Sequence, residues 1–359
     1  MDEYRINFDK LKEFTTEIFE KTGCSRKDAE AVAELLVDSD LRGVRSHGVI
    51  RIKQYVEKIA GGGANPAAEM EIISETSNTA VLDAKGGIGA VASLKAVEIA
   101  KEKAEKNNIG MVAVRNSNHF GMAGHWAIML SGENMIGFAC SNTSCSMPAP
   151  GAAEPALGNN PFAVAYSGEK YKEVCVDMAC SVAAHGKAVD LKSRGKEIPM
   201  DWFLDKDGNY TNDLDVVDML IPFAGHKGFG IAFLVETFGE FLSGGAHSYD
   251  MNQQLDPNAS EDASQFFGAI KIEAFQNLKK FREDVDAFID FEKGLKKKDG
   301  VEAIKYYGEN EYDNKMRIRK EGVTLPISLI NEIREVALKL GISPDRMKFF
   351  TEEPVCKGV

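Results

Sequence analysis

The segment from residue 45 to residue 51 reads Arg-Ser-His-Gly-Val-Ile-Arg and carries the first side chains that could do chemistry. His47 and Arg51 are four residues apart, so a helix through this segment would place both on one face. A guanidinium can hold a carboxylate through two hydrogen bonds while an imidazole exchanges a proton with an oxygen on the adjacent carbon. Ser46 could orient the ring. The alternative is that Ser46 caps a helix beside a partly buried histidine.

A second candidate group lies between Arg115 and Gly121, in the run Arg-Asn-Ser-Asn-His-Phe-Gly. His119 follows an expected strand and precedes an expected helix, which is where α/β proteins bind ligands. Gly121 permits a close approach of the backbone. His125 comes six residues after His119 and off the same helical face, so the two do not predict a metal pair. We therefore predict no metal site and treat His119 as a second acid–base candidate.

Three further loops offer polar groups to a ligand. Ser141 and Thr143 follow another expected strand and supply hydroxyl groups, and Asn160 lies in a Gly-Asn-Asn-Pro turn. Residues 176–179, Val-Asp-Met-Ala, end a strand that leads into Ala-His-Gly-Lys at residues 184–187. Polar side chains at the ends of several strands predict a shared binding site.

The run Gly-His-Lys-Gly at residues 225–228 opens a long apolar helix. Backbone amides at that end, together with Lys227 and the helix dipole, would hold a phosphate. The alternative is tight helix packing through small residues. The sequence contains neither a phosphate-binding G-x-x-x-x-G-K-[ST] loop nor an H-E-x-x-H motif, so it gives no support to nucleotide hydrolysis or to zincin chemistry.

The elements that must position these groups follow from the spacing of apolar residues. Residues 5–61 have helical spacing, and one helix is expected to begin near Ser25. Short apolar runs alternate with helices in the middle of the chain, and helical spacing returns near its end. We therefore expect an α/β protein in three parts. These are a helical part at residues 1–70, an α/β domain at residues 71–312, and a helical segment at residues 313–359 that packs back on the N-terminal helices.

Individual elements are expected at the following residues. The strands are 79–83, 110–115, 136–141, 161–166, 173–178 and 266–272. The helices are 49–59, 91–106, 121–131, 228–242, 273–290 and 326–340. A loop is expected at 189–199 and a hairpin turn at 205–211.

Residues 87–92, Gly-Ile-Gly-Ala-Val-Ala, match a dinucleotide-binding motif in its proper context, after a strand and at the start of a helix. The next expected strand, however, ends in Arg115-Asn116 and lacks the acidic residue that binds a ribose. Arg115 could instead bind a 2′-phosphate. The remaining alternative is that these glycines only make a tight turn.

Composition narrows the class of protein. The chain has 359 residues and a formal net charge of −12, which disfavours nucleic acid as a partner. No apolar run approaches the ~20 residues of a membrane span, and the first residues do not resemble a signal peptide. The cysteines, at positions 24, 140, 145, 175, 180 and 356, lack the spacing of a zinc site. We expect a reduced, cytoplasmic protein with no membrane partner.

Six segments together resemble the malate/L-lactate dehydrogenase family, which includes L-sulfolactate, ureidoglycolate and Δ1-piperideine-2-carboxylate oxidoreductases. They are RSHGVIR (45–51), AVRNSNHFG (113–121), GNNPFA (158–163), VDMACSVAAHGK (176–187), AGHKGFGIAFLVE (224–236) and YGE (307–309). The resemblance implies a large α/β domain with a mixed, non-Rossmann sheet flanked by helices, plus a helical domain made from the N- and C-terminal segments. It also implies NAD(P) binding and a homodimer, and it makes residues 87–92 a structural turn.

The resemblance assigns two different acid–base residues. His119 matches the proton-exchanging residue of the ureidoglycolate dehydrogenases. Ser46 and His47 match the charge-relay and proton-donor pair of the piperideine-carboxylate reductases, with Arg51 holding the substrate carboxylate. Lys187 stands near a position where those reductases use an aspartate, which favours His119. The sequence leaves the choice between the two histidines open.

The expected site residues fall into three groups. The catalytic candidates are His119, His47 and Ser46, and the substrate-binding candidates are Arg51, Ser141 and Thr143. The residues expected to bind NAD or NADP, with NAD preferred, are Phe120, Gly121, Asn160, Asp177, Met178, Ala179, Lys187, His226, Lys227, Gly308 and Glu309. Tyr307 departs from the family, since many members have proline at that position.

The leading hypothesis is hydride transfer between NAD(P) and C2 of a small 2-hydroxy or 2-keto acid of the malate, lactate, sulfolactate or ureidoglycolate type. The partner would then be a small anionic carboxylate. One alternative is reduction of a cyclic 2-imino acid at the same site. Others are a metal-assisted hydrolase or lyase that uses His47, His119 and a carboxylate, or a non-catalytic protein that binds a nicotinamide.

Overall fold

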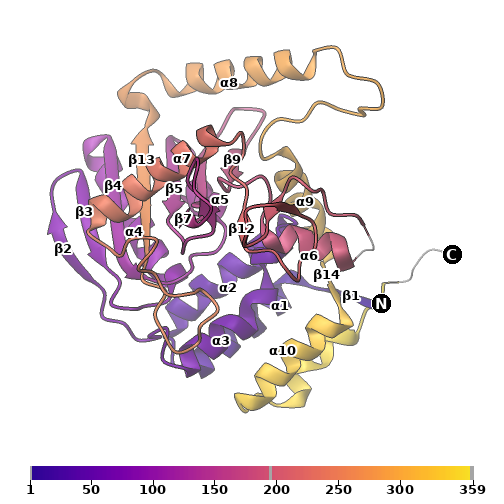
Figure 1. Ribbon diagram of the computed structural model, residues 1–359. Coiled ribbons are helices and arrows are strands. Elements are labelled where there is room, and N and C mark those ends of the chain that lie inside the picture. Colours follow the sequence, from indigo (N-terminus) through magenta and orange to yellow (C-terminus); the bar gives the residue numbers. More distant parts are fainter. Residues whose placement is uncertain (1, 194–195, 356–359) are drawn as a thin grey trace.

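Figure 1 shows the computed structural model of the protein, which describes residues 2–193 and 196–355. No helix within these residues is both long and apolar enough to cross a membrane. Free thiols are present at Cys24, Cys140, Cys145, Cys175 and Cys180, whereas Cys356 lies outside the described residues.

The N-terminal part consists of helices that pack against one side of the molecule. They are α1 (Phe8–Lys21), α2 (Arg26–Leu41), two 3-10 turns (Arg45–His47 and Val49–Arg51) and α3 (Ile52–Ala60). Ser25 caps α2 by accepting the backbone N–H of Asp28 at 3.2 Å, so the expected start of this helix is confirmed. The helix expected at residues 49–59 begins instead as a 3-10 turn.

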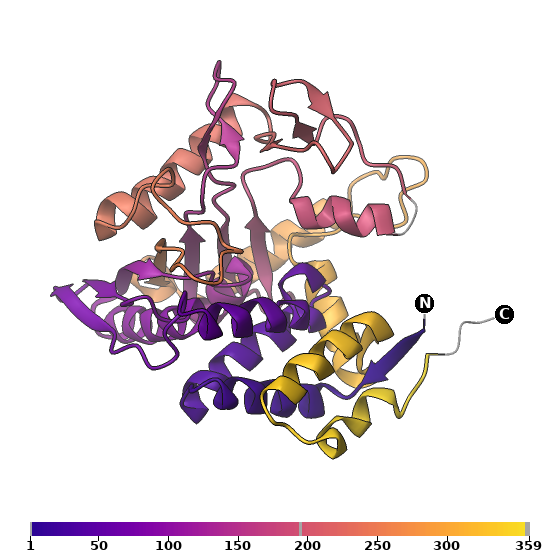
Figure 2. The ribbon, with the colours of Figure 1, turned by 60° about the horizontal axis from the view of Figure 1, so that its bottom comes forward.

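The last part of the chain lies beside the first (Figure 2). It contains α9 (Glu309–Glu321), β14 (Val323–Pro326), α10 (Ile327–Lys339) and a 3-10 helix (Pro344–Thr351). β14 pairs antiparallel with β1 (Glu3–Ile6), with Ile6 opposite Val323. Neither strand was expected, because only helical spacing was recognised in these regions and a four-residue strand is stabilised by its distant partner rather than by its own sequence.

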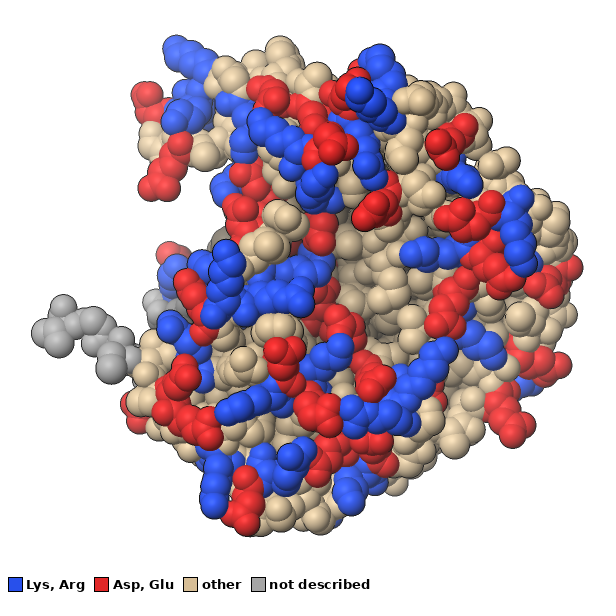
Figure 3. All heavy atoms as spheres, turned by 180° about the vertical axis from the view of Figure 1, so that it is seen from behind, with Lys and Arg blue, Asp and Glu red and all other residues tan. Residues whose placement is uncertain are grey.

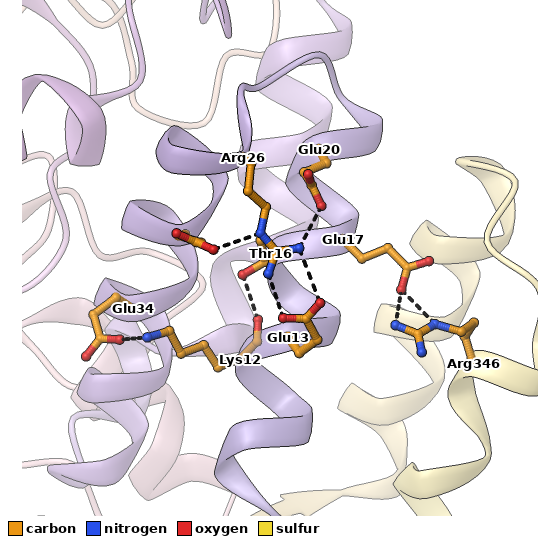
Figure 4. A network of polar contacts seen from close by, with 9 residues as sticks. Lys12, Glu13, Thr16, Glu17, Glu20, Arg26, Glu34 and Arg346 are labelled. Atoms are coloured by element: carbon orange, nitrogen blue, oxygen red, sulfur yellow. Dashed lines mark hydrogen bonds and ion pairs between the residues drawn. The ribbon is translucent and has the colours of Figure 1, made fainter.

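Ion pairs on the outer surface join these terminal helices (Figure 4). Arg26 of α2 binds Glu13 and Glu20 of α1 at 2.7 and 3.1 Å, and Arg346 binds Glu17 at 2.7 Å. Each exposed pair contributes at most about 1 kcal/mol. On the face seen in Figure 3, basic and acidic side chains lie next to one another over most of the surface.

A seven-stranded mixed sheet forms the centre of the protein. Its strand order is β2-β3-β4-β13-β5-β8-β9, and only β3 and β4 are parallel. The strands are β2 (Glu71–Glu75), β3 (Thr79–Asp83), β4 (Ile109–Ser117), β5 (Met135–Ser141), β8 (Phe162–Tyr166), β9 (Val174–Met178) and β13 (Ala263–Lys271). A Rossmann sheet is mostly parallel, so the expectation of a mixed, non-Rossmann sheet is confirmed.

Helices cover both faces of the sheet. Val112 and Val114 of β4 belong to the main core with α4 (Gly89–Asn107) and α5 (Ala123–Ser131). The neighbouring Ala113 packs with Val235 of α7 (His226–Glu236), which continues as a π-helical turn at Thr237–Phe241. Because adjacent residues of a strand point to opposite faces, α7 lies on the face opposite α4 and α5.

The remaining elements lie around the sheet. They are β6 (Met147–Pro148), β7 (Pro155–Leu157), α6 (His185–Ser193), β10 (Phe203–Leu204), β11 (Tyr210–Thr211), β12 (Met219–Leu220) and α8 (Leu278–Lys293). β10 and β11 confirm the expected hairpin. The loop expected at residues 189–199 is wrong over its first part, because α6 extends to Ser193. Ala188 and Leu191, one helical turn apart, pack there against a second apolar cluster. Residues 194–195 lie outside the described residues.

A buried cluster of charged side chains connects the N-terminal helices, the sheet and α9. We call it the Asp38 cluster; it contains Asp38, Arg42, His125, Glu173 and Lys315. Asp38 accepts hydrogen bonds from Arg42 at 2.8 Å and from His125 at 2.9 Å, and Lys315 lies 2.9 Å away. Arg42 also donates to Glu173 at 2.6 Å. Burial alone would raise the pKa of Asp38, but the hydrogen bond from His125 and the charges of Arg42 and Lys315 hold it well below its usual value.

Replacement of Asp38 by alanine should lower the free energy of unfolding by about 3–5 kcal/mol, because it leaves Arg42 and Lys315 with Glu173 as their one remaining carboxylate in the cluster. Denaturant unfolding measures this change. The matched control is Glu98→Ala, which removes the exposed partner of Lys27 and should cost less than about 1 kcal/mol.

The pH dependence of stability gives a second readout for the same variant. The pKa of Asp38 is lower in the folded protein than in the unfolded chain. The stabilisation that its carboxylate gives to the fold is therefore present above the unfolded pKa, about 3.9, and is lost as the pH falls through the folded pKa. The Asp38 variant should therefore lose less stability on acidification than the wild type. If acidification lowers the stability of the Asp38 and Glu98 variants equally, the cluster does not have this role.

Candidate active site

The main cavity, of about 540 Å³, lies where the N-terminal helices meet the sheet. Its walls come from the Arg45–Arg51 segment, from the loop after β4, and from the ends of β5 and β9. Eleven of the residues predicted from the sequence to be catalytic or to bind a ligand line this cavity: His47, Arg51, His119, Phe120, Gly121, Ser141, Thr143, Asp177, Met178, Ala179 and Gly308. Residues more than 250 positions apart in the sequence therefore meet at one cavity.

The Arg45–Arg51 segment is not one continuous helix. It forms two 3-10 turns separated by Gly48, whose extended ψ of −155° interrupts the helix. The buried Asp40 carboxylate accepts the N–H of Val49 at 2.8 Å at this break. The expectation that His47 and Arg51 share one helical face is wrong for this reason. Both side chains nevertheless line the cavity.

Hydrogen bonds within the segment fix His47 and Arg51. Ser46 Oγ lies 2.9 Å from His47 Nδ1. Arg51 donates from Nε to the Ser46 carbonyl and from Nη1 to Gln54 Oε1, both at 2.7 Å. Among the described residues Arg51 Nη2 has no protein partner, so the guanidinium retains a free donor group in the cavity wall.

His119 is positioned by its own partners. Its Nδ1 lies 2.7 Å from the hydroxyl of Tyr55 on α3. The other ring nitrogen, Nε2, takes no part in this hydrogen bond. The rings of His119 and His47 are stacked with centroids 5.6 Å apart. Gly89, at the start of α4, packs against the backbone of His119, because a Cβ there would lie 2.2 Å from the His119 carbonyl oxygen.

Both histidines are uncharged at neutral pH. They contact solvent through the cavity, while protein surrounds them on the other sides. Burial, followed by the charge of Arg51, lowers the pKa of His47 to about 4. The same two causes lower the pKa of His119 well below its usual value. A neutral imidazole has a free lone pair, so either ring can accept a proton.

The loop after β4 and the end of β9 form the rest of the wall. Gly121 has a φ of +78°, and a Cβ there would lie 2.6 Å from Leu35, so this position requires glycine. Asp177 accepts the N–H of Gly124 at 3.0 Å, which ties the end of β9 to the start of α5.

Five predicted cofactor residues do not line the cavity within the described part of the chain: Asn160, Lys187, His226, Lys227 and Glu309. Asn160 is buried behind the wall, where it accepts the N–H of Thr143 at 3.0 Å. The Lys187 ammonium lies over the Trp202 ring, and Glu309 pairs with Lys293. At the start of α7 the amides of residues 227 and 228 already donate to backbone carbonyls, so they are not free for a phosphate.

Comparison with known proteins places this fold and cavity in a family. The sequence profile described as malate/L-lactate dehydrogenase matches residues 6–334. A malate dehydrogenase from Pyrococcus abyssi is 36% identical over 94% of this chain and 95% of its own length. An L-sulfolactate dehydrogenase from Methanocaldococcus jannaschii is 34% identical over 92% of this chain and 96% of its own length. The crystal structure of malate dehydrogenase from Entamoeba histolytica superposes with a TM-score of 0.91 at 31% identity, covering 95% of this chain and 99% of that one.

The chain belongs to the malate/L-lactate dehydrogenase family. Sequence reasoning missed three residues near His119 in this dehydrogenase: Tyr55, which is hydrogen-bonded to His119, and Gln254 and Glu261, which line the cavity. Tyr55 follows Arg51 by four residues, so helical spacing was a usable signal for it. Gln254 and Glu261 come from a long loop, and no local pattern marks them. The described residues contain no group of histidine, cysteine or acidic side chains arranged to hold a metal ion.

Replacement of Gly48 by alanine should lower the thermal midpoint, because the new Cβ would lie 2.0 Å from Asp40 Oδ1 and overpacking of this kind costs about 1–3 kcal/mol. Thermal unfolding measures the effect. Gly230→Ala is the control, since a Cβ there has no atom within 4 Å and alanine favours the helix by roughly 0.5–1 kcal/mol. A thermal midpoint unchanged in Gly48→Ala would show that the Asp40 contact does not fix this turn.

Proposed function

We propose that the protein is a nicotinamide-dependent oxidoreductase that interconverts a small 2-hydroxy acid and the corresponding 2-keto acid. The observation that carries this proposal is the convergence of three groups on one cavity: the His119–Tyr55 pair, His47 and the free end of Arg51. A carboxylate bound by the guanidinium would bring the adjacent oxygen-bearing carbon next to an imidazole that is neutral at pH 7.

The proton is assigned to His119. With the Tyr55 oxygen accepting the Nδ1 proton, Nε2 presents a lone pair and can accept the substrate hydroxyl proton as the alcohol is oxidised. In the reverse direction the same nitrogen returns the proton to the carbonyl oxygen. His47 stacks against this ring and is held by Ser46. We therefore propose that His47 orients the His119 ring and the substrate oxygen.

The cavity suits a nicotinamide dinucleotide. Its volume of about 540 Å³ lies in the range of roughly 300–1,000 Å³ typical of ligand sites. Phe120, Gly121 and the Asp177–Ala179 segment would hold the cofactor, with Gly308 further along the lining. A bound nicotinamide would supply the hydride acceptor or donor. Because these groups converge from separate strands, the protein's contribution is to hold the reacting groups close together.

Charge favours NAD over NADP. Glu173, Asp177 and Glu311 all contribute to the cavity lining. Arg42, a cation in the same wall, is already bound to Asp38 and Glu173. A 2′-phosphate beside these three acidic side chains would meet negative charge and an arginine that is already paired, whereas ribose hydroxyls can donate hydrogen bonds to a carboxylate.

The substrate is proposed to be a 2-hydroxy acid of the malate or sulfolactate type. The relatives at 36% and 34% identity carry those two names. Both kinds of molecule have a carboxylate next to the hydroxyl-bearing carbon, which is the group that Arg51 is placed to bind. Sequence similarity and the Arg51 position together support this class of substrate.

A homodimer is also proposed, built on the outer side of α7. Five apolar side chains of α7, its π-helical turn and the next residue are between 38% and 54% exposed: Phe233, Leu234, Phe238, Phe241 and Leu242. A cluster of large exposed apolar residues on consecutive helical turns is typical of a surface that packs against another protein. A second copy of the chain presents the same surface and can bury it by two-fold symmetry.

Purified protein should oxidise NADH in the presence of oxaloacetate or sulfopyruvate, and His119→Ala should lower kcat by about 10²–10⁴-fold because it removes the acid–base group. Loss of NADH absorbance measures turnover. NADH binding, measured by fluorescence, should persist in the variant.

His47→Ala and Tyr55→Phe complete this experiment. Each should reduce kcat less than His119→Ala, because each alters the positioning of the ring and not the group that carries the proton. A larger loss in His47→Ala would move the acid–base role to His47. Absence of turnover by the wild type with malate, sulfolactate and lactate and their keto acids, using both cofactors, would refute the proposed function.

The double variant Leu234→Glu/Phe241→Glu should shift the protein from dimer to monomer, because the charges prevent burial of the α7 surface. Sedimentation analysis at several concentrations measures the molar mass. The control is Phe291→Glu on α8, a side chain that is 63% exposed but lies outside this surface. A wild-type monomer, or a dimer that survives the double variant, would contradict the α7 interface.

A further inference from the structure

Glu261 is a buried carboxyl group in the wall of the main cavity that the proposed function leaves unused. Its side chain belongs to the cavity lining together with Arg51, His119 and Gln254. The residue is 2% exposed, and its carboxyl oxygen Oε2 is buried with no hydrogen-bond partner among the described residues. Its backbone is fixed, because the N–H of Glu261 donates to Asn118 Oδ1 at 3.1 Å.

No cation in the surroundings forms an ion pair with Glu261 within the described part of the chain. The charged and titratable groups that face it are Arg51, Tyr55 and Lys58 from the N-terminal segment, His119 after β4, and Asp262 beside it. Lys58 instead donates to the carbonyls of Gln254 and Asp256 at 3.2 and 3.1 Å. Two donor nitrogens of Arg51 are occupied by Ser46 and Gln54.

Burial therefore dominates the protonation of this carboxyl. It raises the pKa of Glu261 to about 7, against the smaller opposing effects of the Lys58 charge and the nearby N–H of His119. A buried polar atom without a partner is destabilising, and in most proteins it is satisfied by a ligand or by water. Because the residue that carries this oxygen lines the main cavity, the missing partner indicates a binding role.

The ionisation state decides what Glu261 can bind. An ionised carboxylate would repel an anionic substrate in a site of low dielectric constant. A protonated carboxyl group is a hydrogen-bond donor and binds a carboxylate oxygen through a short, charge-assisted hydrogen bond. A cavity that takes a 2-keto acid therefore favours the protonated form.

We propose that Glu261 is a substrate-binding residue, and that its protonated carboxyl group donates a hydrogen bond to an oxygen of the bound acid beside Arg51. The inference rests on the proposed function, because it takes the ligand to be a 2-hydroxy or 2-keto acid. It adds a pH dependence to the affinity of the site. Substrate binding is strongest below the pKa of Glu261 and weakens by up to about tenfold per pH unit above it, because the ionised form must first take up a proton.

The test is the dissociation constant of oxamate, a keto-acid analogue that the enzyme cannot reduce, measured by calorimetry on the NADH-saturated protein between about pH 5.5 and pH 8.5. The wild type should bind oxamate at least tenfold more weakly at the upper end of this range than at the lower end. Glu261→Gln keeps a hydrogen-bond donor at this position but cannot ionise, so its affinity should change much less with pH. Glu57→Gln, an exposed side chain on α3, should follow the wild type.

Three outcomes would overturn the proposal. The first is an oxamate affinity of the wild type that does not depend on pH, or no oxamate binding at all. The second is a Glu261→Gln profile equal to that of the wild type, which would assign the dependence to another group such as Asp177, whose pKa is raised to about 6. The third is a Glu261→Gln variant that loses kcat at an unchanged KM.

The failure of this inference is distinguishable from failure of the proposed function. Absence of turnover with every keto acid, combined with pH-dependent oxamate binding that Glu261→Gln flattens, would reject the dehydrogenase reaction and retain the role of Glu261. Turnover with flat oxamate binding would retain the reaction and reject that role.

Discussion

The docking of the N-terminal helices on the sheet depends on the buried Asp38 cluster. Asp38 receives hydrogen bonds from α2 and α5, and Lys315 reaches it from α9. Buried ion pairs of this kind often add little net stability, but removal of one partner is costly. The main effect of the cluster is therefore to specify how α2, α5 and α9 are arranged, and its net contribution to stability is smaller. The cavity lies at this same junction, and Arg42 and Glu173 of the cluster form part of its wall.

The net charge of the protein, −12, bears on how the proposed anionic substrate would bind. The overall field repels a carboxylate, so the binding site must depend on local groups. The Arg51 guanidinium lies beside two histidines that burial keeps neutral. The low pKa of these rings and the raised pKa of Glu261 have the same cause, the desolvation of charged forms at the cavity wall. In the proposed reaction this single physical effect would prepare proton acceptors and remove a charge that repels the substrate.

Much of the fold could be predicted from the sequence, because the helices and central strands have strong apolar periodicity of their own. The resemblance carried by six motifs implied the mixed sheet, and those motifs contain His119, His47 and Arg51, which line one cavity. The pairing of β1 with β14 was missed because each strand depends on a partner more than 300 residues away. Glu261 and Gln254 were missed because only the tertiary fold carries their loop to the cavity. The boundaries at residues 70 and 313 stay a prediction.

The pairing of β1 with β14 has a consequence for how the chain is made. During synthesis the first strand emerges long before the last, and a ribosome adds roughly 5–20 residues per second. β1 must therefore wait tens of seconds, at roughly that rate, for its partner to appear. Lys315, which completes the Asp38 cluster, emerges only shortly before β14. Until then β1 and the N-terminal helices of the nascent chain lack these partners, and unpaired strand edges and exposed apolar surface of this kind favour aggregation.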